Sequence, residues 1–195
     1  RLRSPLSTTL LFAHGRCLAV MLNLGVLISG RGTNLQALLD ACADGRCAAR
    51  VAVVVSNVKN AQGLDRARQA RAPAVVLAPE KGEPRPRYDA RLTAVLQEHQ
   101  VELVCLAGFM RILSPQLLQA FPQRVINIHP ALLPAFPGLG VQAAAVDYGV
   151  KIAGCTVHFV DEGVDSGPII LQAAVPVYDS DDAERLAARI LEREH

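Results

Sequence analysis

Residues 22–42 read LNLGVLISGRGTNLQALLDAC, and this stretch decides the fold. Leu22–Ile28 is a short apolar run that ends in the small and polar residues Ser29–Asn34. From Leu35 the apolar positions recur at i, i+3, i+4 and i+7, as far as Cys42, which is the buried stripe of an amphipathic helix. The stretch therefore predicts a strand, a tight turn and a helix.

The same alternation continues through the middle of the chain. Strands are expected at apolar, β-branched runs, and helices where apolar residues recur every three to four positions. The expected strands are 51–55, 74–77, 101–107 and 125–128, and the expected helices are 61–71, 88–99 and a short one opened by Ser114-Pro115. This order predicts parallel strands in one sheet with helices on both faces, and Gly82–Arg87 is expected as an exposed loop.

The last third of the chain changes character. Strands are expected at 152–160 and 168–177, separated by only the seven residues Asp161–Gly167, and a closing helix from about Asp182. Such a short connection favours an antiparallel pair. The predicted fold class is α/β: a single-domain, Rossmann-like open sheet of mostly parallel strands, with helices on both faces and an antiparallel C-terminal excursion.

Composition limits the possible classes of function. A chain of 195 residues, 51% of them hydrophobic, suits one domain, and a net charge of +2 gives no case for nucleic-acid or membrane binding. No apolar stretch approaches the roughly 20 residues of a membrane span. The five cysteines match no metal-binding spacing, so we interpret them as free thiols in a reducing cytoplasm and expect no metal.

The first 20 residues contain three arginines and no acidic residue. A transit peptide has this character, but recognisable fold patterning begins only at Leu22. We therefore expect residues 1–20 to be an extension outside the fold, and the domain to begin at Met21.

Two interpretations of the SGRGTN turn at residues 29–34 remain open. Small residues there let backbone N–H groups approach an anion such as a phosphate at the positive end of the following helix. The alternative is a tight turn in which Thr33 or Asn34 caps the helix. The motif lacks the third glycine of a dinucleotide site and the Lys-Ser/Thr pair of a P-loop.

A second polar motif is Asn127-Ile128-His129, at the end of an expected strand. Residues two apart on a strand point to the same face, so both polar side chains emerge where open α/β sheets form their ligand crevice. Asp165, within Gly163–Gly167, is either a turn former or a carboxylate at the rim of this site. Sequence spacing alone does not decide whether it meets His129.

Four stretches together carry a resemblance to a known family. They are SGRGTNLQALLDAC (29–42), LAGFMRILSP (106–115), NIHPALLPAFPG (127–138) and TVHFVDEGVDSGPIILQ (156–172). In this order they resemble the phosphoribosylglycinamide formyltransferases, folate-dependent enzymes of purine synthesis. Methionyl-tRNA formyltransferases and formyltetrahydrofolate deformylases share the Asn-x-His strand and the distant Asp. The former lack this glycine loop, and the latter carry an extra N-terminal domain.

The resemblance implies a reaction and its partners. The amine of glycinamide ribonucleotide attacks the formyl carbon of 10-formyltetrahydrofolate, a co-substrate, without a metal. The expected partners are these small molecules, with no nucleic acid or membrane, and the chain is expected to act in the cytoplasm as a monomer or homodimer. By the same resemblance, residues 21–195 form a formyltransferase domain that lacks its C-terminal end.

The resemblance also assigns roles to individual residues. Asn127 and His129 supply hydrogen-bond donors to the oxyanion, and Asp165 keeps the imidazole charged and helps to relay a proton. Gly32, Thr33 and Asn34 hold the substrate phosphate, and Glu194 lies near its ribose. The expected folate contacts are Arg85, Met110, Arg111, Ile112, Leu113 and Asn127. His158 matches a family histidine near the site, and a purely structural role for it is an equal alternative.

One departure from the family pattern concerns Gly140, which stands where the family commonly has a histidine; a slower enzyme is the expected result. Two other functions remain as alternatives. One is a hydrolase that releases formate from the same folate, and the other is a nucleotide- or folate-binding module without turnover.

Overall fold

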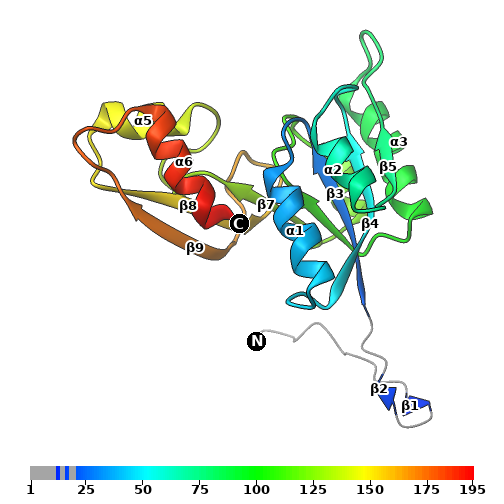
Figure 1. Cartoon of the computed structure of the whole chain (residues 1–195). Helices are drawn as coiled ribbons and strands as arrows, with labels where there is room; N and C mark the ends of the chain where they lie inside the picture. Colours follow the sequence, from blue (N-terminus) through cyan, green and yellow to red (C-terminus); the bar gives the residue numbers. More distant parts are fainter. Residues whose placement is uncertain (1–11, 14–15, 18–20) are drawn as a thin grey trace, which may run out of the picture.

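The computed structural model describes residues 12–13, 16–17 and 21–195. The prediction that residues 1–20 lie outside the fold falls mostly on residues that are not described. Within that segment, β1 (Phe12–Ala13) and β2 (Arg16–Cys17) pair only with each other, in a two-stranded antiparallel sheet. All other strands among the described residues belong to one sheet (Figure 1).

That main sheet has seven strands in the order β5-β4-β3-β6-β7-β8-β9. The strands are β3 (Leu22–Ile28), β4 (Ala49–Ser56), β5 (Ala74–Val76), β6 (Leu103–Leu106), β7 (Val125–His129), β8 (Ile152–Phe159) and β9 (Ile169–Pro176). The first five in spatial order are parallel, whereas β8 runs antiparallel to β7 and β9 antiparallel to β8. The predicted fold class is confirmed.

Six helices in the described part of the chain cover this sheet. They are α1 (Thr33–Ala43), α2 (Gly63–Gln69), α3 (Arg85–Glu98), α4 (Pro115–Ala120), α5 (Val141–Tyr148) and α6 (Ala183–Glu194). Apolar residues of α1 and α2 form a core on one face, and those of α3 and α4 form a core on the other. A third cluster lies between α5, α6 and strands β8 and β9 (Figure 1). None of the helices in the described part of the chain has the length and apolarity needed to cross a bilayer.

Two details differ from the sequence prediction. Helix α3 begins at Arg85, so the expected loop at Gly82–Arg87 is wrong in its second half: Pro84 precedes the first turn and Pro86 lies in it, where a missing N–H costs no helical bond. Helix α5 was not predicted. It has only eight residues and lies between Gly140 and Gly149, both with positive φ, so its apolar period is too short to stand out.

The strand order reverses between β3 and β6, because β4 and β5 lie on one side of β3 and β6 and β7 on the other. Loops that leave the carboxyl ends of parallel strands at such a point diverge and open a crevice, which is where open α/β sheets bind ligands. Here the diverging loops are the turn after β3, with SGRGTN, and the loop after β6, with Gly108.

Candidate active site

The polar residues of β7 share the face of the sheet opposite to α1 and α6. Ile126 and Ile128 pack into the clusters formed with those helices, so Asn127 and His129 point the other way. His129 is only 4% exposed. The predicted pair therefore lies together at the carboxyl end of a strand, where the crevice opens.

His158 joins this pair from the neighbouring strand. The antiparallel register of β7 and β8 sets His158 opposite Asn127, and the Asn127 Nδ2 lies 3.2 Å from the His158 Nε2. The His158 Nδ1 is 2.9 Å from the carbonyl oxygen of Phe159. The ring therefore donates through Nδ1 and accepts the Asn127 amide through Nε2, which fixes its tautomer. Of the two open interpretations of His158, this contact favours a place in the site.

Asp165 reaches the same site from the loop after β8. Its Oδ2 accepts the backbone N–H of Gly138 at 2.8 Å and lies 3.3 Å from the His129 Nδ1. Its Oδ1 lies 3.5 Å from the Asn127 Nδ2 and 3.6 Å from the His158 Nε2. The backbone of Asp165 has a φ of +51°, a left-handed conformation that a short polar side chain tolerates. The loop thus brings the carboxylate to the imidazole.

Both nitrogens of the His129 ring face acceptors. Nδ1 faces the Asp165 carboxylate, and Nε2 lies 2.9 Å from the carbonyl oxygen of Phe136. Only an imidazolium has an N–H on both nitrogens, so the protonated ring is the form that satisfies both contacts. Gly138, which sequence reasoning did not single out, completes the arrangement. The Pro137-Gly138 pair is a turn motif and could have indicated this residue, whose φ is +88°.

A cleft of about 490 Å³ opens above these residues. Asn127, His129, His158 and Asp165 all line it, as do the predicted folate residues Met110, Arg111, Ile112 and Leu113. Met110 and Ile112 are 65% and 53% exposed, so this wall presents apolar surface to the cleft. A flat, partly apolar ligand such as a pterin suits such a wall.

Neither of the two arginines predicted to contact the folate directs its charge into the cleft: Arg111 stacks on a tyrosine, and Arg85 lies outside the cleft lining. The Arg111 guanidinium stacks over the ring of Tyr88, with its Cζ 4.2 Å from the ring centre, so its charge is directed toward α3. Burial raises the pKa of Tyr88 to about 12, which leaves its neutral hydroxyl to donate to the Leu77 carbonyl. Arg85 lies in the first turn of α3 and does not line the cleft.

The predicted phosphate turn leads into α1. Gly32 occupies the N-cap position with a φ of +71°, and a Cβ there would lie 2.6 Å from the Cα of Gly63, so only glycine fits. No side chain caps the helix, so the alternative of a Thr33 or Asn34 cap is wrong. Asn34 instead donates to the Glu194 Oε2 at 2.7 Å, which joins two of the predicted substrate residues across 160 positions.

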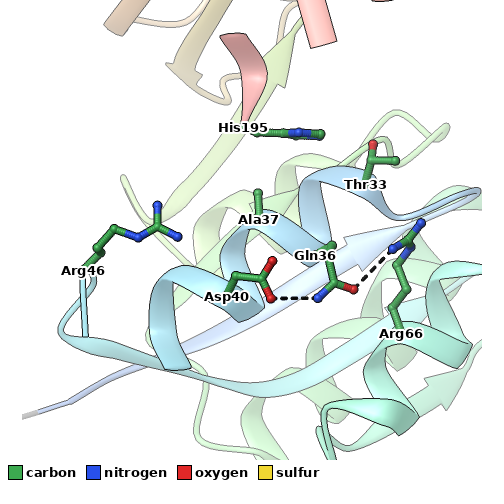
Figure 2. Close-up of a pocket in the computed structure, with 7 residues that line it drawn as sticks. All are labelled: Thr33, Gln36, Ala37, Asp40, Arg46, Arg66 and His195. Atoms are coloured by element: carbon green, nitrogen blue, oxygen red, sulfur yellow. Dashed lines mark hydrogen bonds between the residues drawn. The ribbon is translucent and has the colours of Figure 1, made fainter. Parts of the chain in front are cut away.

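A second cavity, of about 290 Å³, lies beside this turn. Figure 2 shows His195 over the first turns of α1, with Thr33 and Ala37 below it. Gln36 bridges Asp40 and Arg66, at 2.8 and 3.3 Å (Figure 2). Arg66, whose Nε donates to the Arg31 carbonyl, borders the predicted phosphate turn, whereas Arg46 lines the cavity at the other end of α1.

Comparison with known proteins places this geometry in a family. Residues 22–195 match the family model described as formyl transferase. The chain belongs to the formyl transferase family. The family assignment agrees with the resemblance inferred from the four motifs, which is thereby confirmed.

Curated relatives of the family differ in length. The chain is 43% identical to the phosphoribosylglycinamide formyltransferase of Haemophilus influenzae over 175 residues, which covers 90% of this chain and 82% of that protein. It is 51% identical to the trifunctional purine biosynthetic protein adenosine-3 of Drosophila melanogaster over 172 residues, 87% of this chain. That match spans only 13% of the trifunctional protein.

Solved structures of the family share the fold. The glycinamide ribonucleotide transformylase 1 of Symbiobacterium toebii superposes with a TM-score of 0.88 at 57% identity, covering 89% of this chain and 82% of that chain. The phosphoribosylglycinamide formyltransferase of Anaplasma phagocytophilum gives 0.83 at 47% identity, covering 89% and 80%. Among the described residues, no group of three or more His, Cys, Asp or Glu side chains is arranged to hold a metal.

Proposed function

We propose that this chain transfers the formyl group of 10-formyltetrahydrofolate to the amine of glycinamide ribonucleotide, in purine biosynthesis. The products are formylglycinamide ribonucleotide and tetrahydrofolate. The observation that carries the proposal is the convergence of Asn127, His129 and Asp165 in the lining of one cleft, in a member of the formyl transferase family.

The geometry supports a direct transfer. When the amine attacks the formyl carbon, the formyl oxygen becomes negative in a tetrahedral intermediate, and N–H donors aimed at that oxygen stabilise it. The Asn127 amide and the His129 ring are such donors, and the formyl oxygen must displace the Asn127 N–H from its contact with His158 or Asp165 to use it. A charged ring is the stronger one, because charge-assisted hydrogen bonds are roughly twice as strong as neutral ones. The Nε2 proton faces the Phe136 carbonyl, so the formyl oxygen must displace that bond to use it.

Proton transfer completes the reaction. The attacking amine loses a proton and the folate nitrogen gains one as the carbon–nitrogen bond to the folate breaks. Asp165 lies within 3.6 Å of both His129 and His158 and is the carboxylate that accepts the proton, through water. No covalent enzyme intermediate is needed.

The two substrates occupy different parts of the crevice. The pterin lies against the Met110–Leu113 wall, and the phosphate binds the N–H groups of Gly32, Thr33 and Asn34, at the positive end of α1. Glu194, already bonded to Asn34, accepts from the ribose hydroxyls. Arg85 contacts the glutamate tail outside the cleft.

The domain limits, the oligomeric state and the cellular compartment belong to the same proposal. Residues 1–20 form an extension outside the catalytic domain, and the chain acts as a monomer or homodimer on small molecules alone. Four cysteines in the described residues are free, among them the buried Cys105 and Cys155. Thiols that stay reduced fit the cytoplasm.

The deciding experiment is an assay with both substrates that follows the folate absorbance with and without glycinamide ribonucleotide. Formyl transfer that requires the ribonucleotide supports the proposal. Formate release without it supports the hydrolase, and binding without turnover supports a binding module. His129→Ala is expected to lower kcat by about 10²–10⁴-fold while both substrates still bind. An unchanged kcat in this variant would exclude the mechanism.

A further inference from the structure

Ser29 connects the two halves of the crevice. It is the first residue after β3 and belongs to the turn that leads to the proposed phosphate site. Its hydroxyl accepts the backbone N–H of Met110 at 2.8 Å and donates to the Asn57 Oδ1 at 2.6 Å. Its own backbone N–H donates to the Gly108 carbonyl at 3.1 Å. One serine thus contacts the loops that follow β3, β4 and β6.

These contacts lie at the point where the strand order reverses. The loops after β3 and β6 diverge there, and two bonds of Ser29 join them: its backbone N–H to the Gly108 carbonyl and its hydroxyl to the Met110 N–H. The Met110–Leu113 wall begins at Met110, and the backbone N–H of Met110 donates to the Ser29 hydroxyl. The Asn57 side chain orients that hydroxyl, because it takes the hydroxyl proton and leaves a lone pair for Met110.

The phosphate turn has an anchor of its own. The backbone N–H of Gly63 donates to the Gly30 carbonyl at 3.0 Å, and Gly32 packs directly on Gly63. Loss of the Ser29 hydroxyl therefore leaves the phosphate turn attached to α2. The loop after β6 keeps the backbone bond from Ser29 to Gly108, but Met110 loses the bond to the hydroxyl, and the Met110 side chain, 65% exposed, has little packing to replace it.

We propose that Ser29, oriented by Asn57, is a positioning residue that sets the folate-lining wall against the phosphate turn. The proposal rests on the function proposed above. It makes the Ser29 hydroxyl a determinant of folate affinity, although the hydroxyl itself touches neither substrate. A merely structural hydroxyl would affect stability without distinguishing between the two substrates.

The test compares KM for each substrate in Ser29→Ala, Asn57→Ala and Ser29→Thr, together with thermal unfolding. Ser29→Ala is expected to raise the KM for 10-formyltetrahydrofolate about fivefold, which at 1.4 kcal/mol per factor of ten corresponds to one ordinary hydrogen bond. The KM for glycinamide ribonucleotide should stay within twofold of the wild type. Ser29→Thr keeps the hydroxyl and should restore the folate KM. Asn57→Ala should reproduce the effect, and the double variant should add little to it.

Equal changes in both KM values, or none, would overturn the proposal, as would a loss of thermal stability with no change in the ratio of the two KM values. Calorimetric binding of 5-formyltetrahydrofolate, a stable reduced folate, separates this proposal from the proposed function. If the wild type binds this folate but transfers no formyl group, the proposed function fails, and the change in Kd in Ser29→Ala still tests the positioning role. A wild type that binds no reduced folate would refute both.

Discussion

The Asp165 carboxylate is the group whose removal tests the site most sharply. Asp165→Asn keeps the size of the side chain and an oxygen that can accept the Gly138 N–H, so the loop keeps its anchor. It removes the negative charge 3.3 Å from the His129 Nδ1. The oxygen that accepts the Gly138 N–H is also the one that faces Nδ1, so it still accepts from that nitrogen, now as a neutral acceptor, and the new NH₂ group takes the place of Oδ1 beside Asn127 and His158.

The size of the effect follows from the geometry. Two unit charges 3.3 Å apart attract by at most about 5 kcal/mol at an effective dielectric constant of 20, and hydrogen bonds to charged groups contribute about 1.5–3 kcal/mol net. With about 1.36 kcal/mol per factor of ten in rate, kcat should fall by about 10- to 5,000-fold. Because Asp165 belongs neither to the Met110–Leu113 wall nor to the phosphate turn, both KM values should change by less than about threefold.

The measurement is the steady-state rate with both substrates, compared with the matched control Asp179→Asn. Asp179 pairs with Lys151 at the surface, and its side chain is 92% exposed. The control makes the same chemical change away from the cleft and should leave kcat unchanged. If Asp165→Asn retained a kcat within threefold of the wild type, the carboxylate would have no role in the transfer.

Three further changes have defined outcomes. Gly140→His places a side chain in open space on a backbone with a φ of +69°, so we expect the free energy of unfolding to fall by about 1 kcal/mol and the thermal midpoint by about 2–4 °C. We also expect a higher kcat, and an unchanged kcat would show that the glycine does not slow the enzyme. Glu194→Ala frees Asn34 and should raise the KM for glycinamide ribonucleotide by about tenfold in the two-substrate assay; an effect on the folate KM alone would contradict the assignment. Arg189 lowers the pKa of Asp181 to about 2 from an ordinary value of 3.8, so the stability that this pair contributes is complete above pH 4 and is lost as the pH falls through 2. The difference in thermal midpoint between the wild type and Asp181→Asn should therefore shrink from pH 4 to pH 2, and a constant difference would refute this.

Sequence reasoning succeeded where the signal is local. The strand, turn and helix of residues 22–42 follow from apolar spacing within one stretch, and the shared face of Asn127 and His129 follows from the period of two along a strand. Each depends on neighbours in the chain, so tertiary packing had little opportunity to change them. The short α5, with one weak period between two glycines, did not give a local signal of this kind.

The contacts that build the site are non-local. His158 faces Asn127 only because of the antiparallel register of β7 and β8, and a shift of one residue would turn it to the other face of the sheet. Asp165 reaches His129 through a left-handed backbone angle and a bond to Gly138, 27 positions away. Residue spacing predicts neither the register of the strands nor the direction of the loop. The sequence alone therefore did not decide whether Asp165 contacts His129.

The proposed catalytic role of this site carries a cost in stability. His129 is 4% exposed and the Asp165 side chain 14%, and burying an ion pair costs desolvation that its attraction often fails to repay. The compensation is the set of donors around the carboxylate: Gly138 and His129 at one oxygen, and Asn127 at the other. Strand β7 supplies two of these donors and the loop after it supplies the third, so the position of the 161–167 loop is set by both segments together. In the proposed mechanism a change that moves this loop alters the partner of His129 and both oxyanion donors at once, so we expect it to lower kcat before it weakens the binding of either substrate.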